Sequence, residues 1–128
     1  MFESTKAYSG FAVDDLEKAH AFYSETLGVR ASVLDEENGL LSLDLAGDRA
    51  TLVYQKPDHA PANYTILNFP VDDIEATVDE LAARGVSFER YEGFEQDEKG
   101  IARGPGPKIA WFKDPAGNIL SVLEEPQA

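Results

Sequence analysis

The chain has 128 residues, of which 24 are acidic and 11 are basic, giving a formal net charge of -13. Nucleic-acid affinity depends on Lys and Arg releasing the counterions of phosphates, so this charge argues against a nucleic-acid partner. The chain has no cysteine, which excludes disulfides, thiolate metal sites and a thiol nucleophile. No apolar run approaches a membrane span, and the N-terminal residues lack the apolar core of a secretion signal. We therefore expect no membrane partner and a cytoplasmic location.

A short internal repeat organises the chain. The sequence VDDLE at Val13–Glu17 recurs as VDDIE at Val71–Glu75, after 58 residues. Each copy follows a strand-like run, Tyr8–Val13 or Thr65–Val71, and precedes apolar residues at helical spacing. The two helical patterns end at Gly28 and Gly85.

The repeated motif also predicts where each helix begins. We expect Asp14 to cap the first helix, with Glu17 reaching back three residues later, and Asp72 with Glu75 to repeat the arrangement. The acidic residues suit the positive end of the helix dipole. The motif is therefore interpreted as structural.

Strand-like runs follow both helical patterns, so that each half of the chain reads β-α-β-β-β. The sequence DPAGN at 114–118 predicts a tight turn before the last run. We expect a first module at about 6–56, a linker at 57–63 and a second module at about 64–125, together forming a single domain, 1–128. The runs are Ala31–Leu34, Leu40–Leu45, Thr51–Gln55, Ser87–Tyr91, Ile109–Lys113 and Ile119–Leu123.

This tandem repeat, with FxDPxGN at Phe112–Asn118, resembles the vicinal oxygen chelate superfamily. That superfamily includes glyoxalase, extradiol dioxygenases, methylmalonyl-CoA epimerase, and the bleomycin and fosfomycin resistance proteins. The resemblance covers about Tyr8 to Glu125. It implies an α+β fold in which tandem β-α-β-β-β modules form a curved mixed sheet around a cavity, with the helices on the convex face.

Strand alternation sorts residues between the two faces of such a sheet. Apolar residues at one parity are expected to pack under the helices, and on the last strand these are Leu120 and Val122. Residues at the other parity are expected to face the cavity. They are Tyr8, Gly10, Ala12, Ile66, Asn68, Pro70, Ile119, Ser121 and Leu123.

The resemblance also identifies where a metal would be bound. In the metal enzymes of the superfamily, a His lies five residues before the motif valine and a Glu lies four residues after the DPxGN glycine. Those positions are Tyr8, Ile66 and Ser121 here, and the fourth falls near Thr51 or Leu52. Because divalent metals prefer imidazole and carboxylate donors, we expect no metal site and no cofactor.

The two histidines do not restore a metal site. His20 lies within the first helical pattern, where a surface or half-packed role is expected. His59 lies in the linker, as an exposed loop residue, a cavity-rim residue or a ligand donated across a dimer.

Several polar and aromatic residues are candidates for lining a ligand cavity. Trp111, the only tryptophan, offers either a stacking surface or plain sheet core. The Gly- and Pro-rich stretch at 91–107 is long enough to be a lid or binding loop, and within it Arg103 is either a fork for an anionic group or a solvated loop residue. The candidate ligand-binding residues are Tyr8, Tyr54, Asn68, Phe94, Arg103, Trp111 and Ser121, with Tyr64 as a further lining residue.

These observations favour a metal-independent small-molecule-binding protein of the glyoxalase/bleomycin-resistance type, acting in drug or metabolite sequestration. The partner would be a small organic molecule, cationic or aromatic, and the resemblance implies a homodimer. The alternative is a lyase, isomerase or dioxygenase-like enzyme with a displaced active site that uses Tyr8, Asn68, Glu124 or His59. A regulatory or interaction module is a third class.

Overall fold

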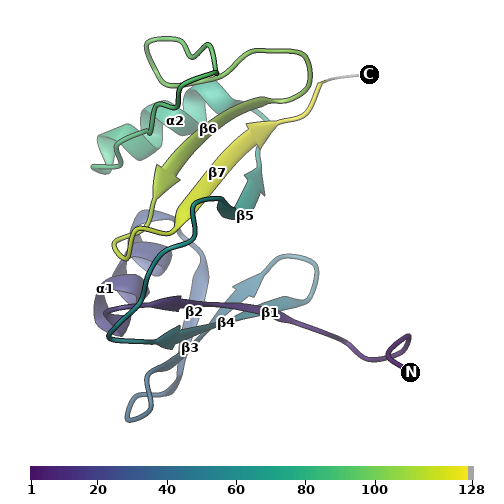
Figure 1. The fold of residues 1–128 in the computed structure, drawn as a ribbon, viewed down its shortest axis with the longest axis vertical. Coiled ribbons are helices and arrows are strands. Elements are labelled where there is room, and N and C mark those ends of the chain that lie inside the picture. The colour runs from purple at the N-terminus through teal and green to yellow at the C-terminus, as the bar shows by residue number, and fades with distance from the viewer. Residues whose placement is uncertain (127–128) are drawn as a thin grey trace. The chain divides into compact units, whose positions relative to one another are not determined.

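A computed structural model describes residues 1–126 of the chain. The chain divides into two compact units, Met1–Ala60 and a second that begins at Pro61. Each unit contains one mixed β-sheet with a helical segment packed against it, which confirms the α+β prediction (Figure 1). No helix within residues 1–126 has the length and apolar character needed to cross a membrane. The arrangement of both modules as one domain around a shared cavity stays a prediction.

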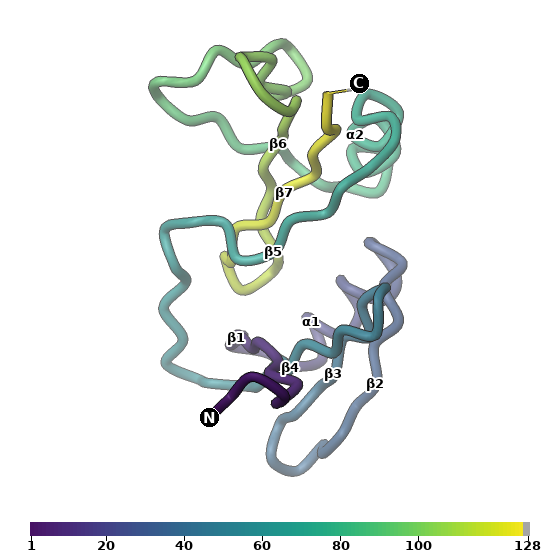
Figure 2. Tube along the Cα trace, turned by 90° about the vertical axis from the view of Figure 1, so that its right-hand side faces the viewer, coloured from purple at the N-terminus to yellow at the C-terminus, as the bar shows by residue number. Residues whose placement is uncertain are grey.

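The first unit has its four strands in the order β1-β4-β3-β2, with β1 parallel to β4 (Figure 2). The predicted first helix is an α-helix that continues as a π-helix, where the Leu27 N–H donates to the Phe22 carbonyl across 3.0 Å. The helical segment ends at Gly28, whose φ of 70° a glycine adopts without strain. The elements are β1 (Ser9–Val13), α1 (Leu16–Ala21), η1 (Phe22–Thr26), β2 (Arg30–Asp35), β3 (Leu40–Leu45) and β4 (Arg49–Gln55).

The second unit has three strands in the order β5-β7-β6, with β5 parallel to β7. Helix α2 packs against β6 and β7. It ends with Gly85 at a φ of 92°, and the Val86 N–H donates to the Leu81 carbonyl across 3.0 Å, which closes a Schellman motif. The elements are β5 (Thr65–Pro70), α2 (Ile74–Ala83), β6 (Lys108–Lys113) and β7 (Ile119–Glu124).

The prediction of a strand at 87–91 is wrong. Only Phe88 forms a bridge, to Phe112, and the Glu89 N–H donates to the Trp111 carbonyl across 2.8 Å. The chain then leaves the sheet, and Ala102 returns to pair with Ile109 farther along the same edge of β6. Two short segments thus share the edge on which a full strand was expected.

The predicted helix caps are displaced by one residue. Asp15 and Asp73, not Asp14 and Asp72, accept from the third N–H of each helix, across 3.1 Å in both cases. Lys18 and Ala76 occupy the position that a capping-box Glu would need, so Glu17 and Glu75 serve only as acidic first-turn residues.

A side chain from the last strand of each unit caps the first N–H of its helix. The Gln55 Oε1 accepts from the Leu16 N–H across 2.9 Å, and the Glu124 Oε1 accepts from the Ile74 N–H across 3.0 Å. Each helix start is therefore fixed both by its own preceding aspartate and by the end of a strand. This repeated contact follows the internal repeat of the sequence.

The predicted turn at 114–118 is confirmed. The Asp114 Oδ1 accepts from the N–H groups of Ala116 and Asn118, across 2.9 Å each, while its Oδ2 accepts from the Asn118 side chain. Gly117 has a φ of 88°, which the turn requires. Asp114 is buried, so its carboxylate is satisfied within the turn and fixes where β7 begins.

Replacing Asp73 with alanine should lower the free energy of unfolding by about 1 kcal/mol, because the third N–H of α2 loses its acceptor. Urea denaturation measures the change. Asp72→Ala removes the same charge from the neighbouring position and should cost much less. Equal losses in the two variants would contradict the capping assignment.

Candidate functional site

Three of the predicted site residues lie side by side across the second sheet. In the strand register, Asn68 of β5 is opposite Ser121 of β7, and Ser121 is opposite Trp111 of β6. Glu124 lies at the other parity of β7 and contacts the start of α2, so the row lies on the sheet face away from that helix. The register puts Trp111 on the same face as Asn68 and Ser121, and the role of all three in ligand binding stays a prediction.

Ser121 is fully buried, and its hydroxyl donates to the Asn68 Oδ1 across 2.6 Å. The pair brings a hydroxyl and an amide together at the centre of the sheet face. Because the amide oxygen already satisfies the hydroxyl proton, the Asn68 side chain retains its amide N–H groups for other partners. The pair can therefore offer hydrogen bonds, but neither group is a strong acid or base.

Trp111 is the centre of an apolar cluster on the same face. It is 9% exposed and packs with Ala102 and Ile119, while Tyr91 and Ile109 contact the cluster from its margin. The Phe94 ring lies 5.0 Å from the Trp111 ring, and its side chain is 56% exposed. Trp111 is thus both sheet core and the base of an aromatic surface that Phe94 extends to the solvent.

A pocket of about 1050 Å³ adjoins this cluster. It lies in the stretch at 91–107, and it shares Phe94, Ala102 and Ile109 with the surroundings of Trp111. The volume is in the range of small-molecule sites. The pocket is lined by Gly93, Phe94, Glu95, Gln96, Asp97, Ile101, Ala102, Arg103, Gly104, Pro105, Pro107 and Ile109.

The side-chain amide of Gln96 shapes the loop around this pocket. Its Oε1 accepts from the Tyr91 N–H across 2.9 Å, and its Nε2 donates to the carbonyls of Glu89 and Gly100 across 2.9 and 2.8 Å. These bonds take the place of the backbone hydrogen bonds that a strand at 87–91 would have formed with a neighbouring strand. One side chain therefore holds both ends of the loop.

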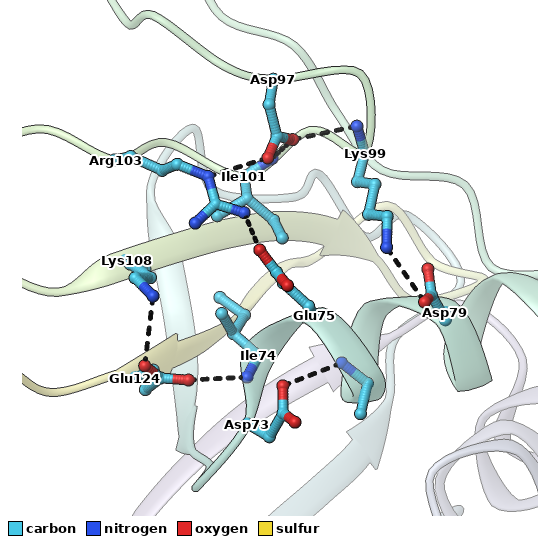
Figure 3. A network of polar contacts seen from close by, with 11 residues as sticks. Asp73, Ile74, Glu75, Asp79, Asp97, Lys99, Ile101, Arg103, Lys108 and Glu124 are labelled. Atoms are coloured by element: carbon cyan, nitrogen blue, oxygen red, sulfur yellow. Dashed lines mark hydrogen bonds and ion pairs between the residues drawn. The ribbon is translucent and has the colours of Figure 1, made fainter.

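A charged network ties the same loop to α2 (Figure 3). The Arg103 guanidinium contacts Glu75 of α2 and also the Asp97 Oδ2, at 2.9 Å. Lys99 contacts Asp79, one turn farther along α2, across 3.0 Å. Arg103 therefore lines the pocket with its charge already compensated, and an anionic ligand would have to compete with two carboxylates.

Asp97 is the acceptor at the centre of the network. Partial burial raises the pKa of its carboxyl, but the Ile101 N–H, the Arg103 side chain and the Lys99 N–H together lower the pKa below its usual value. The Arg103 pKa is raised, first by Glu75 and then by Asp97. Both groups are thus held in their charged forms at neutral pH.

The remaining candidates belong to other segments of the chain. Tyr8 lies just before β1 and is 72% exposed, and Tyr54 is 39% exposed on β4, both in the first unit. Tyr64 is exposed just before β5. Their contribution to ligand binding stays a prediction.

Both histidines are half-buried, which agrees with the half-packed role expected for His20 but not with an exposed loop role for His59. The backbone carbonyl of His20 accepts from Ser24 across 2.6 Å within the helical segment. His59 lies in the loop after β4.

Tyr91 and Gln96 shape the site although the sequence does not indicate that they do. The sequence predicts Tyr91 as the last residue of a strand, whereas in the structure its ring lies 5.4 Å from the Trp111 ring at an interplanar angle of 78°. Gln96 carries no periodic signal, because its contacts are made to the backbone of a loop. The one available signal was the break in periodicity at 91–107, which marked the loop but not which side chains shape it.

Comparison with known proteins decides the family. Residues 7–122 match the family described as the Glyoxalase/Bleomycin resistance protein/Dioxygenase superfamily. The chain belongs to this superfamily. The match spans both copies of the internal repeat, as the resemblance in the sequence implied.

Individual members of the superfamily carry different names. The chain is 30% identical to "Probable lactoylglutathione lyase" of Vibrio cholerae serotype O1, over 91% of this chain and 87% of that one. It is 26% identical to TnmS3, an antibiotic binding protein from Streptomyces sp. CB03234, with a TM-score of 0.70 over 96% and 98% of the two chains. It is 27% identical to lactoylglutathione lyase from Agrobacterium tumefaciens, with a TM-score of 0.62 over 95% and 96%.

The residues at the metal-ligand positions of the superfamily do not fit a divalent metal. Those positions hold Tyr8, Ile66 and Ser121, of which Ile66 has no donor atom and Ser121 is engaged with Asn68. The fourth position falls near Thr51 or Leu52 of β4, where Thr51 offers only a neutral, buried hydroxyl and Leu52 has no donor atom. No group of three His, Asp or Glu side chains within residues 1–126 is placed to hold a metal.

Acidification should loosen the pocket loop. Because the Asp97 pKa is lowered in the folded chain, its contribution to stability is present above the ordinary carboxylate range and is lost as the pH falls through that lowered value. The protection of the amides of residues 99–103 against hydrogen exchange should therefore be greater above pH ~4 than at lower pH. Asp97→Asn should raise exchange there already at neutral pH, whereas Glu98→Gln should not. Unchanged exchange in Asp97→Asn would contradict the role given to the carboxylate.

Proposed function

We propose that this chain is a metal-independent small-molecule-binding protein of the glyoxalase/bleomycin-resistance type, which sequesters a drug or metabolite. The observation that carries the proposal is the burial of the Ser121 hydroxyl and its hydrogen bond to Asn68. Where the metal enzymes of the superfamily have a glutamate, this chain has a fully buried hydroxyl that is hydrogen-bonded to Asn68. Beside it lie an aromatic surface and a pocket of about 1050 Å³. These features suit binding without metal chemistry.

The charge of the pocket favours a cationic or aromatic ligand. Its charged lining residues are Glu95, Asp97 and Arg103, and the last two pair with each other. Within residues 1–126 the Glu95 carboxylate has no ion pair, so it is available to a ligand cation. The Phe94 ring beside it offers a stacking or cation–π surface. The net charge of -13 would also attract cations to the molecule.

The names of the relatives support two functions. TnmS3 is an antibiotic binding protein, in line with sequestration. The lactoylglutathione lyase names support the alternative, a lyase, isomerase or dioxygenase-like enzyme with a displaced active site. Of the candidates for that role, Glu124 caps α2 with one carboxylate oxygen and has Lys108 3.5 Å from the other. Its engagement with both groups favours a structural role and hence sequestration. The homodimer and the cytoplasmic location stay predictions.

Purified protein should contain no stoichiometric metal. After chelation, adding Zn²⁺, Ni²⁺ or Mn²⁺ should leave the Tm unchanged, because a specific site would stabilise the native state by about 2.7 kcal/mol at a hundredfold excess over Kd. Elemental analysis and thermal unfolding measure both quantities. A bound metal together with a Tm increase would instead support a displaced active site, and lactoylglutathione lyase turnover would then be assayed.

Glu95→Gln should weaken the binding of a cationic aromatic probe, 1-naphthylmethylamine, by about 0.5–1 kcal/mol, because the pocket loses its available carboxylate. Isothermal titration calorimetry at low salt gives the affinities. Glu92→Gln is the matched control, since it removes an equal charge from the same loop but from a residue outside the pocket lining. Equal weakening in both variants would show that only the overall charge matters.

A further inference from the structure

Strand β2 forms an open edge of the first sheet. In the order β1-β4-β3-β2 it pairs with β3 alone, so its other side has no strand partner among residues 1–126 (Figure 2). Four of its six residues are exposed, and two of these are apolar, Val33 at 48% and Leu34 at 59%. The strand contains no Lys or Pro, the residues that commonly block such an edge. An edge of this kind is suited to pairing with a strand of another chain.

A β-bulge sets which side chains of β2 share a face. The register with β3 shifts between Val33 and Asp35, so Leu34 is an extra residue in the strand. Side chains of a strand alternate between the two faces, which puts Arg30 and Ser32 on the same face. The extra residue brings Asp35 to that face as well, because it reverses the alternation at this point. The segment before the bulge stays regular.

The charges on this edge are complementary to each other. Arg30 is the first residue of β2 and Asp35 is the last. Within residues 1–126 neither forms an ion pair, and the Asp35 carboxylate accepts from the neutral Asn38, across 3.0 Å from its backbone N–H and 2.7 Å from its side chain. When two copies of one strand pair antiparallel, the first residue of each lies opposite the last residue of the other. Two such strands would therefore place opposite charges face to face at both ends.

We propose that β2 is an interaction surface for a second copy of this chain, whose own β2 pairs with it antiparallel and joins the two first sheets into one. Arg30 would lie opposite the partner's Asp35, and Val33 opposite the partner's Ala31. Ser32 would lie opposite the partner's Ser32 at the two-fold axis. The contact is closed, so it joins two copies through β2 and no more. This inference concerns assembly and does not depend on the proposed ligand.

A single introduced thiol tests the position of the axis. Because the chain has no cysteine, Ser32→Cys carries one thiol, placed opposite its own copy. Opposite Cα atoms in an antiparallel pair are about 4.5–5.5 Å apart, which a disulfide can span. Ser9→Cys is the matched control, since it exposes one thiol on β1, the opposite edge of the same sheet. Under mild oxidation Ser32→Cys should form a linked dimer about tenfold faster than Ser9→Cys, measured by non-reducing electrophoresis.

Exchanging the charges tests the register. Arg30→Asp places like charges opposite each other and should weaken the dimer about tenfold in sedimentation velocity at physiological salt. The double variant Arg30→Asp/Asp35→Arg restores opposite charges across the axis and should regain most of the lost affinity. Arg49→Asp makes the same charge change at an exposed position of β4 and should leave the dimer unchanged. Thermal unfolding verifies that each variant is folded.

Three results would overturn the role of β2. The first is a wild-type chain that stays monomeric at millimolar concentration. The second is a linked dimer that forms as fast from Ser9→Cys as from Ser32→Cys. The third is a double variant that associates no better than Arg30→Asp. Each leaves the proposed ligand-binding function standing, because the metal and 1-naphthylmethylamine experiments test that function separately.

Discussion

The candidate site depends on one side-chain amide. Gln96 accepts from the Tyr91 N–H and donates to the carbonyls of Glu89 and Gly100, so it satisfies three backbone groups that would otherwise need a strand partner. Because of these bonds the chain can leave the edge of β6, form a pocket and return at Ala102 without exposing its backbone to an apolar interior. Tyr91, Phe94 and the pocket lining all take their positions from this loop.

In both units a side chain from the last strand accepts from the first N–H of the helix, but the accepting group differs. Each helix begins with an aspartate cap and receives a side chain from the last strand of its unit, Gln55 in the first and Glu124 in the second. The amide is neutral, whereas the carboxylate adds a charge that suits the helix dipole. In the second unit this charge lies near Lys108, and the loop network of Arg103 and Asp97 is built on the same helix (Figure 3). The two units thus share the arrangement at the helix start, while the second unit carries more ion pairs among the described residues.

Much of the fold could be predicted from the sequence, because its signals were periodic or repeated. The strand at Leu40–Leu45 and the turn at 114–118 were predicted correctly, and alternation alone put Asn68 and Ser121 on one sheet face. It assigned no face to Trp111, which only the strand register aligns with Ser121. The helix caps were displaced by one residue because VDD offers two adjacent aspartates and only backbone geometry distinguishes them. The prediction of a strand at 87–91 is wrong for another reason. The Gln96 side chain, which lies outside the run, binds backbone groups of Glu89 and Tyr91 that a strand partner would otherwise bind. No local pattern in the sequence reveals such a competitor.

The two bridges on β6 separate the sheet from the loop between them. Phe88 and Ala102 anchor the ends of that segment. Ile101, near one end, is fully buried, whereas Phe94 and Glu95 in the middle are exposed. Substitutions at positions such as Phe94 and Glu95 therefore change the binding surface while the strands stay paired. Such a division lets natural selection explore new ligands at low cost to folding, much as hypervariable loops do on a constant framework. In this superfamily, where related chains carry names as different as lyase and antibiotic binding protein, the second unit has a built-in route to diversification.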